Sequence, residues 1–348
     1  MLILSRVFAE ATSLPGESIS YGMQRFTVTV LSFLLTAAAY LPLAAAVSRS
    51  GGSSPVVVIA DRSKLLSGFL GVLISVFLLF CAAGTGLRSQ YYASSTVFDS
   101  APSLYFYFFT GAALLFAVYK GLEVSSRAAT AVAAVLAFLL LLMICALLGD
   151  IRLNRLYPVL TDDTAGLAGD VIREFSKNSE YLVFAVLCGN VSGKKSSCTV
   201  TVPIYLGVSC AAVLLMTFLY NTVFGRLASR LSFPFYTLST ISDITLLHRI
   251  NGIDTAVWVM AGILRLALYA LAFGSVVRSC FAGERAAKIA AMVFAALSLG
   301  LSALFTAYPE LYEPIRRAGA SGIPLAAAAI MIPAAALLCG IGRKAVKQ

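Results

Sequence analysis

The sequence carries very little charge for its length. Only 12% of its 348 residues are Asp, Glu, Lys or Arg, whereas an average soluble domain carries about 25%. A soluble protein needs a polar outer layer, so this composition excludes a soluble globular enzyme, a disordered chain and a nucleic-acid-binding domain. The chain is instead 59% hydrophobic, with a mean hydropathy of +0.90. We therefore predict an all-α membrane protein with several spans, whose net charge of +10 marks cytoplasmic loops rather than a nucleic-acid partner.

Residues that bind metals or perform catalysis are also scarce. His248 is the one histidine, which excludes a metal site of the HExxH type. None of the seven cysteines forms a CxxC pair, and most lie in apolar runs, which favours buried free thiols. The sequence has no Walker A motif, glycine-rich nucleotide loop or nucleophile–base set. We therefore expect no enzyme activity, no metal and no cofactor.

Long apolar segments dominate what is present. A helical span needs about 20 apolar residues, because lipid cannot satisfy an open backbone. Eight segments meet or approach that length: 26–48, 65–86, 103–119, 128–149, 202–222, 254–277, 286–307 and 321–341. The segment 128–149 contains no charge and is the clearest span.

Two weaker apolar segments remain, at 1–15 and at about 164–190. The first carries two charges, and the second has the polar middle SKNSE. Counting both predicts ten spans, with the interrupted ones at positions one and six of two five-helix halves, which is the pattern of an inverted-repeat transporter. The expected repeats, about 1–150 and 160–341, form one membrane domain. The alternative is a cytoplasmic tail followed later by an interfacial helix.

The lysines indicate the orientation. With ten spans, seven of the eight lysines fall in the loops on the side of both termini, and Lys177 lies in the interrupted sixth span. Positive loops are cytoplasmic, so both termini are expected inside. Without span one, the termini would lie on opposite sides. The segment 223–253 is predicted to form a short helical lid on the outer surface, with a plain loop as the alternative.

Arg265 is the most informative single residue, since it lies in the middle of an apolar span. A charge at that depth costs at least about 2.5 kcal/mol and should face a partner inside the bundle. Tyr269 lies four residues later on the same helix face. The pair is a candidate ligand or coupling site, and the alternative is a structural arginine satisfied by backbone carbonyls.

Other charged residues have simpler interpretations. Glu123 and Arg127 are spaced for an ion pair on a helix surface at the start of span five, which favours a role in topology over transport. Charged residues along the first half of span six either shape an outer vestibule or, as favoured here, form a solvated helix face; they are Asp170, Arg173, Glu174 and Lys177. His248 is expected in an exposed loop.

Several stretches resemble the spore germination permeases, the B subunits of endospore germinant receptors. ILSRVFAEATSLPG is similar to the first span of that family, although family members usually begin several residues earlier. VFDSAPSLYFYFFTGAALLFAVYKGLEVSSRAA resembles its fourth span and its Gly-x-Glu-x-x-x-Arg motif, here Gly121, Glu123 and Arg127. RLYPVL places Pro158 where the family has a proline after span five.

The second half carries the most recognisable block of the resemblance. NTVFGRLASRLSFPFYTLST and HRINGIDTAVWVMAGILRLALYALA together provide FG, a proline-containing segment, an arginine before a tryptophan, and a basic residue in span eight. The matching residues are Phe224, Gly225, Pro234, Arg249, Trp258 and Arg265. Structural or topological roles are therefore expected for Gly121, Glu123, Arg127, Pro158, Arg249 and Trp258.

The resemblance implies a fold, partners and a pocket. The family belongs to the amino acid–polyamine–organocation superfamily, with ten spans in a five-plus-five inverted repeat. Its members lie in the inner spore membrane, work with a larger A subunit and a lipoprotein C subunit, and sense small germinants such as amino acids. Its ligand pocket uses spans one, three, six and eight. This implies ligand contacts from Arg265 and Tyr269 in span eight, Tyr181 and Phe184 in span six, and Phe77 and Phe80 in span three.

Three functions remain open on the sequence. The first is a germinant-receptor subunit that binds a small amino-acid-like ligand and signals to its partners. The second is a proton-coupled amino-acid transporter of the same superfamily. The third is a structural membrane subunit whose pocket has degenerated.

Overall fold

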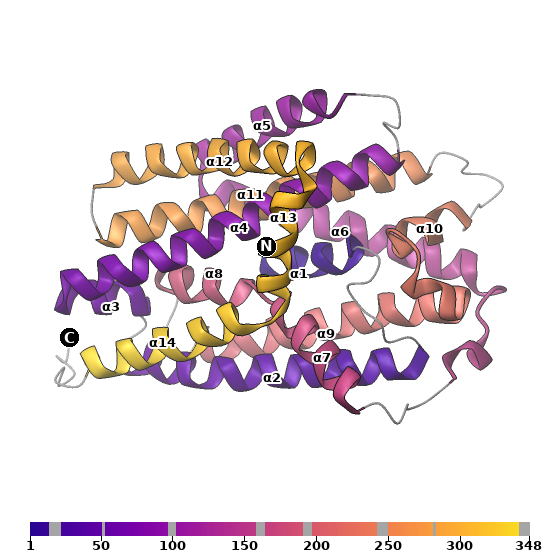
Figure 1. Ribbon diagram of the computed structural model, residues 1–348, viewed down its shortest axis with the longest axis horizontal. Helices are drawn as coiled ribbons and strands as arrows, with labels where there is room; N and C mark the ends of the chain where they lie inside the picture. The colour runs from indigo at the N-terminus through magenta and orange to yellow at the C-terminus, as the bar shows by residue number, and fades with distance from the viewer. Residues whose placement is uncertain are drawn as a thin grey trace.

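The protein is a bundle of helices in its computed structural model (Figure 1). The structure describes residues 1–13, 22–50, 53–96, 102–157, 164–190, 197–241, 250–280 and 283–340. Within these ranges the regular elements are all helical. The long helices run roughly parallel to one another, as expected when every span must satisfy its own backbone in lipid.

Eight long helices occupy the eight clear apolar segments of the sequence. They are α2 (Gly22–Arg49), α4 (Lys64–Thr96), α5 (Ser103–Lys120), α6 (Leu122–Leu147), α9 (Ser197–Phe224), α11 (Ile250–Cys280), α12 (Glu284–Ala307) and α14 (Ile323–Gly340). Seven of them are long and apolar enough to cross a membrane alone. The eighth, α14, does so together with α13 (Pro309–Ala320), to which it is bent by 53°. The chain is therefore an all-α polytopic membrane protein.

Short helices fill the centre and the ends of the bundle. They are α1 (Leu2–Ala11), α3 (Pro55–Arg62), α7 (Thr164–Ser176), α8 (Glu180–Leu187) and α10 (Pro234–Ile241), with 3-10 turns η1 (Leu153–Leu156), η2 (Cys188–Asn190) and η3 (Gly225–Ser229). Figure 1 shows α3 and α10 near opposite ends of the bundle, and α13 running across the long helices. The predicted lid segment thus contains a helix, α10, while its residues 242–249 lie outside the described part.

The share of buried side chains shows whether a long helix lies at the surface or in the centre of the bundle. In the most apolar stretch of α6 only 17% of the residues are buried, and aromatic side chains such as Phe108 of α5 point outward. In α11 the corresponding share is 67%, so this helix lies in the centre of the bundle. Apolar surface of this extent is stable only against lipid, because water would penalise it.

The sixth predicted span is broken. α7 ends at Ser176 and α8 begins at Glu180, so the interruption falls within the SKNSE sequence. The first weak segment forms α1, which packs against α8, α9 and α11. Both weak segments therefore lie within the bundle, which disagrees with the alternative of a tail and an interfacial helix. The count of ten spans and the five-plus-five repeat remain predictions.

Candidate functional site

Arg265 of α11 lies at the break between α7 and α8. The residue is 7% exposed, and its guanidinium contacts α11 itself, α1 and the break. Nε donates to the Tyr269 hydroxyl at 2.9 Å, Nη1 donates to the backbone carbonyl of Ser5, and Nη2 donates to the Ser179 hydroxyl at 3.2 Å. Nη2 also lies 3.4 Å from Oε1 of Glu180, the first residue of α8. The buried arginine is therefore fully engaged in linking α11 to α1 and to the break.

The partners of Arg265 also bind one another. Ser5 donates its hydroxyl to Glu180 Oε1 at 2.5 Å, and the hydroxyls of Ser179 and Tyr269 share a hydrogen bond of 2.7 Å. We call Ser5, Ser179, Glu180, Arg265 and Tyr269 the Arg265 cluster. It joins an arginine to one carboxylate and three hydroxyls in the protein interior, where each interaction is stronger than in water.

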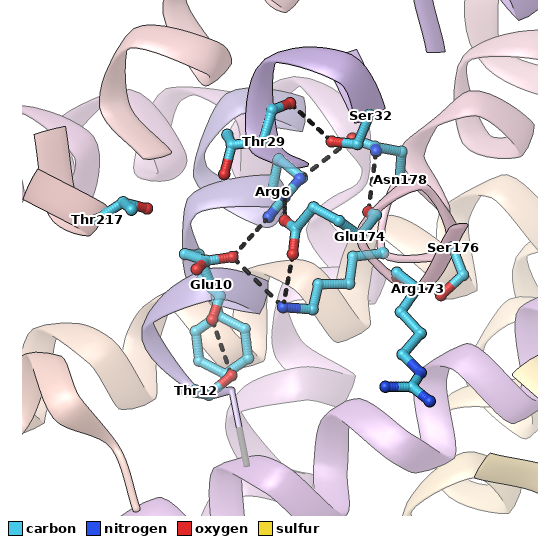
Figure 2. A network of polar contacts seen from close by, with 12 residues as sticks. Arg6, Glu10, Thr12, Thr29, Ser32, Arg173, Glu174, Ser176, Asn178 and Thr217 are labelled. Carbon is cyan, nitrogen blue, oxygen red and sulfur yellow. Dashed lines mark hydrogen bonds and ion pairs between the residues drawn. The ribbon is translucent and has the colours of Figure 1, made fainter. Parts of the chain in front are cut away.

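A second polar group begins at the next residue of α1, Arg6. Five charged residues form what we call the five-charge network: Arg6 and Glu10 of α1, Arg25 of α2, Glu174 in the last turn of α7, and Lys177 directly after α7. Figure 2 shows Arg6, Glu10 and Glu174 directed toward one another. The side chains of these five residues are at most 8% exposed.

Two carboxylates hold the network together. Glu174 accepts from Arg6 through Oε1, and its Oε2 lies 2.7 Å from Arg25 and 3.0 Å from Lys177. Glu10 accepts from Arg25 at 3.0 Å and lies 3.5 Å from Lys177. Buried charges are tolerated only when they are paired in this way.

Neutral side chains complete the five-charge network. Arg6 Nε donates to Asn178 Oδ1 at 3.1 Å, and the hydroxyl of Tyr220 from α9 donates to Glu10 at 3.0 Å. Asn178 lies in the break itself, one residue before Ser179 of the Arg265 cluster. The network and the cluster are thus continuous, and together they join α1, α2, α9 and α11 to the broken helix.

The favoured interpretation of span six as a solvated face is wrong for most of its charges. Asp170, Glu174 and Lys177 are buried, and Arg173 is the half-exposed member. Figure 2 shows Arg173 directed away from Glu174. The sequence pattern could not reveal this burial, because the partners of Glu174 come from α1 and α2, far away in the chain.

The other predicted ligand residues pack in two different parts of the core. Tyr181 and Phe184 of α8 are buried and pack against Tyr40 of α2, with ring centroids 4.9 and 5.6 Å apart. Phe77 packs against the core cluster that contains Tyr181 and Tyr269. Phe80 instead packs against the separate cluster of Ala83, Leu87 and Phe305.

The residues expected to have structural roles lie in different parts of the bundle. Gly121 forms the corner between α5 and α6 with φ +87°, a conformation that favours glycine. Glu123 and Arg127 form an ion pair of 2.7 Å on an exposed face. Trp258 is buried, donates to Asp254 at 3.1 Å and packs against Phe235. Pro158, Arg249 and His248 lie outside the described residues.

Sequence reasoning missed six residues of the Arg265 cluster and the five-charge network: Ser5, Arg6, Glu10, Arg25, Ser179 and Glu180. Arg6 and Glu10 counted only as interruptions of a weak span. The available signal was their spacing of four residues within an otherwise apolar segment. Among the described residues, no group of three His, Cys, Asp or Glu side chains is arranged to hold a metal ion.

An all-α bundle with a broken span and charged side chains at its centre defines an integral membrane protein of the permease type. Residues 28–307 match the family model described as spore germination protein. The match covers most of the chain, so the protein belongs to the spore germination protein family, as the resemblance in its sequence predicted. This family is of the transporter and receptor type and generally forms part of germinant receptor complexes. A comparison with curated proteins found no match.

Proposed function

We propose that this protein is the B subunit of a spore germinant receptor, which binds a small amino-acid-like germinant and signals to partner subunits. Membership of the spore germination family supports a germination-related role in a membrane. The observation that carries the proposal is the Arg265 cluster, in which α1, α11 and the α7–α8 break meet through buried polar contacts. A ligand bound there would contact the ends of the broken helix, where backbone groups lack partners within the helix.

The proposed mechanism is a shift between two conformations. A ligand changes such an equilibrium only if it binds one conformation more tightly than the other. In the described structure, α1 and α7 are joined by the five-charge network, so a ligand that repositions α1 or α8 changes the contacts of both. The lid helix α10, which touches α1, α9 and α11, would transmit or restrict that motion.

The proposal includes partners and a location. The chain would work with an A subunit and a lipoprotein C subunit in the inner membrane of the spore, as the resemblance implies, and both termini would be cytoplasmic, as the lysine distribution predicts. Deletion of the gene in a spore-former, scored against single amino acids, tests the role. A lost response to at least one germinant is expected, and unchanged responses to all germinants would contradict it.

Arg265 provides the sharper test of the site. Arg265→Leu removes every contact of the guanidinium, whereas Arg265→Lys keeps a cation at the position. We expect Arg265→Leu to abolish the ligand response and Arg265→Lys to retain part of it, when both are compared at equal amounts of folded protein. An unaltered response in Arg265→Leu would remove the cluster from the ligand mechanism.

A proton-coupled amino-acid transporter is the second candidate. It is favoured by the buried charges on both sides of a broken span, since such charges commonly mark substrate and ion pathways. Proteoliposomes containing the purified protein should then accumulate an amino acid when a proton gradient is imposed. Binding without flux would favour the receptor, and absence of both would favour a structural subunit.

A further inference from the structure

Asp254, near the start of α11, is a buried acid with one oxygen that lacks a partner. The residue is 4% exposed; its Oδ1 accepts from the Trp258 indole at 3.1 Å, whereas Oδ2 makes no hydrogen bond within the described structure. The side chain of Ser239 from α10 also lies beside this carboxyl group. Among the described residues, no arginine or lysine pairs with Asp254. A buried carboxylate is costly unless it is paired, so this one requires a source of positive charge.

A second oxygen without a partner lies in the same region, on Tyr92 of α4. Tyr92 is 1% exposed, and its hydroxyl makes no hydrogen bond to the described part of the chain. Its side chain interacts electrostatically with Asp254 and lies beside Thr255, the next residue of α11. The hydroxyl and Asp254 Oδ2 are therefore neighbours that do not bond one another directly. Native proteins leave few buried polar atoms unpartnered, so two in one region require an explanation.

The lid helix α10 is held against this region from two sides. The ring of Tyr92 packs edge-on against Phe233 and Tyr236, with centroids 5.2 and 5.9 Å apart. Phe235 packs against Trp258 of α11 with centroids 5.5 Å apart. Phe233, which directly precedes α10, has φ +52°, a left-handed conformation that is rare outside glycine and persists only where packing enforces it. The position of α10 over Tyr92 and Asp254 is therefore fixed by specific contacts.

The charge and the oxygen atoms of this region select the kind of ligand that fits. Hard cations bind oxygen, and protein sites for divalent ions usually supply several carboxylates or carbonyls. One carboxylate among neutral hydroxyls instead balances a single positive charge. Such an ion needs no group of three His, Cys, Asp or Glu side chains, and the described residues contain none. A proton would neutralise Asp254 but would not connect it to Tyr92, whereas an ion bound to both oxygens satisfies both.

We propose that Asp254 Oδ2 and the Tyr92 hydroxyl bind a monovalent alkali cation between α4, α10 and α11, with Ser239 at the edge of the site. We call these three residues the lid site. Asp254 precedes Arg265 by eleven residues, which is roughly 16 Å along a helix, so the lid site is separate from the Arg265 cluster. The bound ion stabilises the arrangement in which α10 packs on α4 and α11, since a ligand favours the state that binds it.

The test uses the purified full-length protein in detergent, with inorganic salts as probes. Thermal unfolding is measured in sodium chloride, in potassium chloride and in N-methyl-D-glucamine chloride, whose cation is too large for the site, at equal ionic strength and pH. We expect the Tm to be at least about 2 °C higher in one of the two alkali salts than in the N-methyl-D-glucamine salt. Equal Tm values in all three salts would overturn the proposal, because water would then suffice to occupy the site.

Conservative variants locate the ion. Asp254→Asn keeps the shape and the acceptor for Trp258 but removes the charge, so it should fold and lose the difference between the salts. Tyr92→Phe keeps the ring packing, and it should raise the alkali concentration needed for half of the Tm shift at least threefold. The matched control is Glu123→Gln, which neutralises an exposed carboxylate and should retain the full shift. A wild-type shift in Asp254→Asn would contradict the lid site.

Two other sources of positive charge have distinct outcomes, and either would overturn the proposal. If a proton neutralises Asp254, acidification should raise the Tm of the wild type but not of Asp254→Asn, with no difference between the salts. Arg249 lies five residues before Asp254 in the sequence and outside the described residues. If Arg249 pairs with Asp254, Arg249→Gln should lower the Tm in every salt, and adding Asp254→Asn should restore it. The proposed function stands in both cases, because it rests on Arg265 and not on the lid site.

Discussion

The five-charge network and the Glu123–Arg127 pair contain the same kinds of side chain at similar distances. Glu123 and Arg127 are 2.7 Å apart, as are Glu174 and Arg25. The first pair is 78% and 79% exposed, whereas Glu174 is 1% and Arg25 4% exposed. Distance therefore does not distinguish them, and burial does: exposed pairs contribute little, while breaking a buried pair leaves an uncompensated charge.

Glu174→Ala should have the largest effect on stability. It leaves the buried cations Arg6, Arg25 and Lys177 with Glu10 as the remaining carboxylate of the network. We expect a loss of about 3–5 kcal/mol in the free energy of unfolding, or failure to accumulate in the membrane. Glu174→Gln keeps the shape and one acceptor, so its loss should be smaller. Unfolding titrations in detergent measure both, and a wild-type value for Glu174→Ala would show that the network is not buried.

The contrast also explains what the sequence could predict. The eight clear spans and the break in the sixth were predictable, because hydrophobic length and a polar interruption are local properties. The network was not, because Arg6 and Glu174 are 168 residues apart and neither sequence neighbourhood identifies the other. Phe77 and Phe80 differ for a related reason. Position along α4 does not reveal which neighbouring helix each side chain meets, and the two pack into different clusters.

The Arg265–Glu180 pair is a single buried ion pair, and breaking it should also destabilise the protein. Arg265→Met keeps most of the side-chain volume but leaves Glu180 without its cation, and we expect a loss of about 3 kcal/mol in the free energy of unfolding. Adding Glu180→Gln removes the unpaired charge, so the double variant should be more stable than Arg265→Met alone. A double-mutant cycle measures this coupling. Additive losses would show that Arg265 and Glu180 do not interact.

Substitution of Trp258 should have an intermediate effect on stability, since its side chain is buried and makes a single hydrogen bond. Trp258→Phe retains an aromatic ring beside Phe235 but leaves Asp254 Oδ1 without the indole donor at 3.1 Å. We expect a loss of about 1–3 kcal/mol in the free energy of unfolding, because a buried acceptor then loses one of its donors. Trp258→Phe in an Asp254→Asn background should cost less, and thermal unfolding of the four proteins measures the difference. Equal costs in the two backgrounds would assign the effect of Trp258 to packing alone.

Breaking the exposed Glu123–Arg127 pair should have the smallest effect on the free energy of unfolding. Arg127→Gln removes the contact with Glu123, and we expect a change of less than about 0.5 kcal/mol, as for other surface pairs one turn apart on a helix. Salt provides the discriminating condition, because mobile ions screen exposed charges far more than buried ones. The small effect of Arg127→Gln should disappear at high salt, while the cost of Glu174→Ala should persist in the same buffer. A cost of Arg127→Gln as large as that of Glu174→Ala would contradict the exposure of Arg127. It would mean that a partner or lipid headgroups cover Arg127 in the folded state.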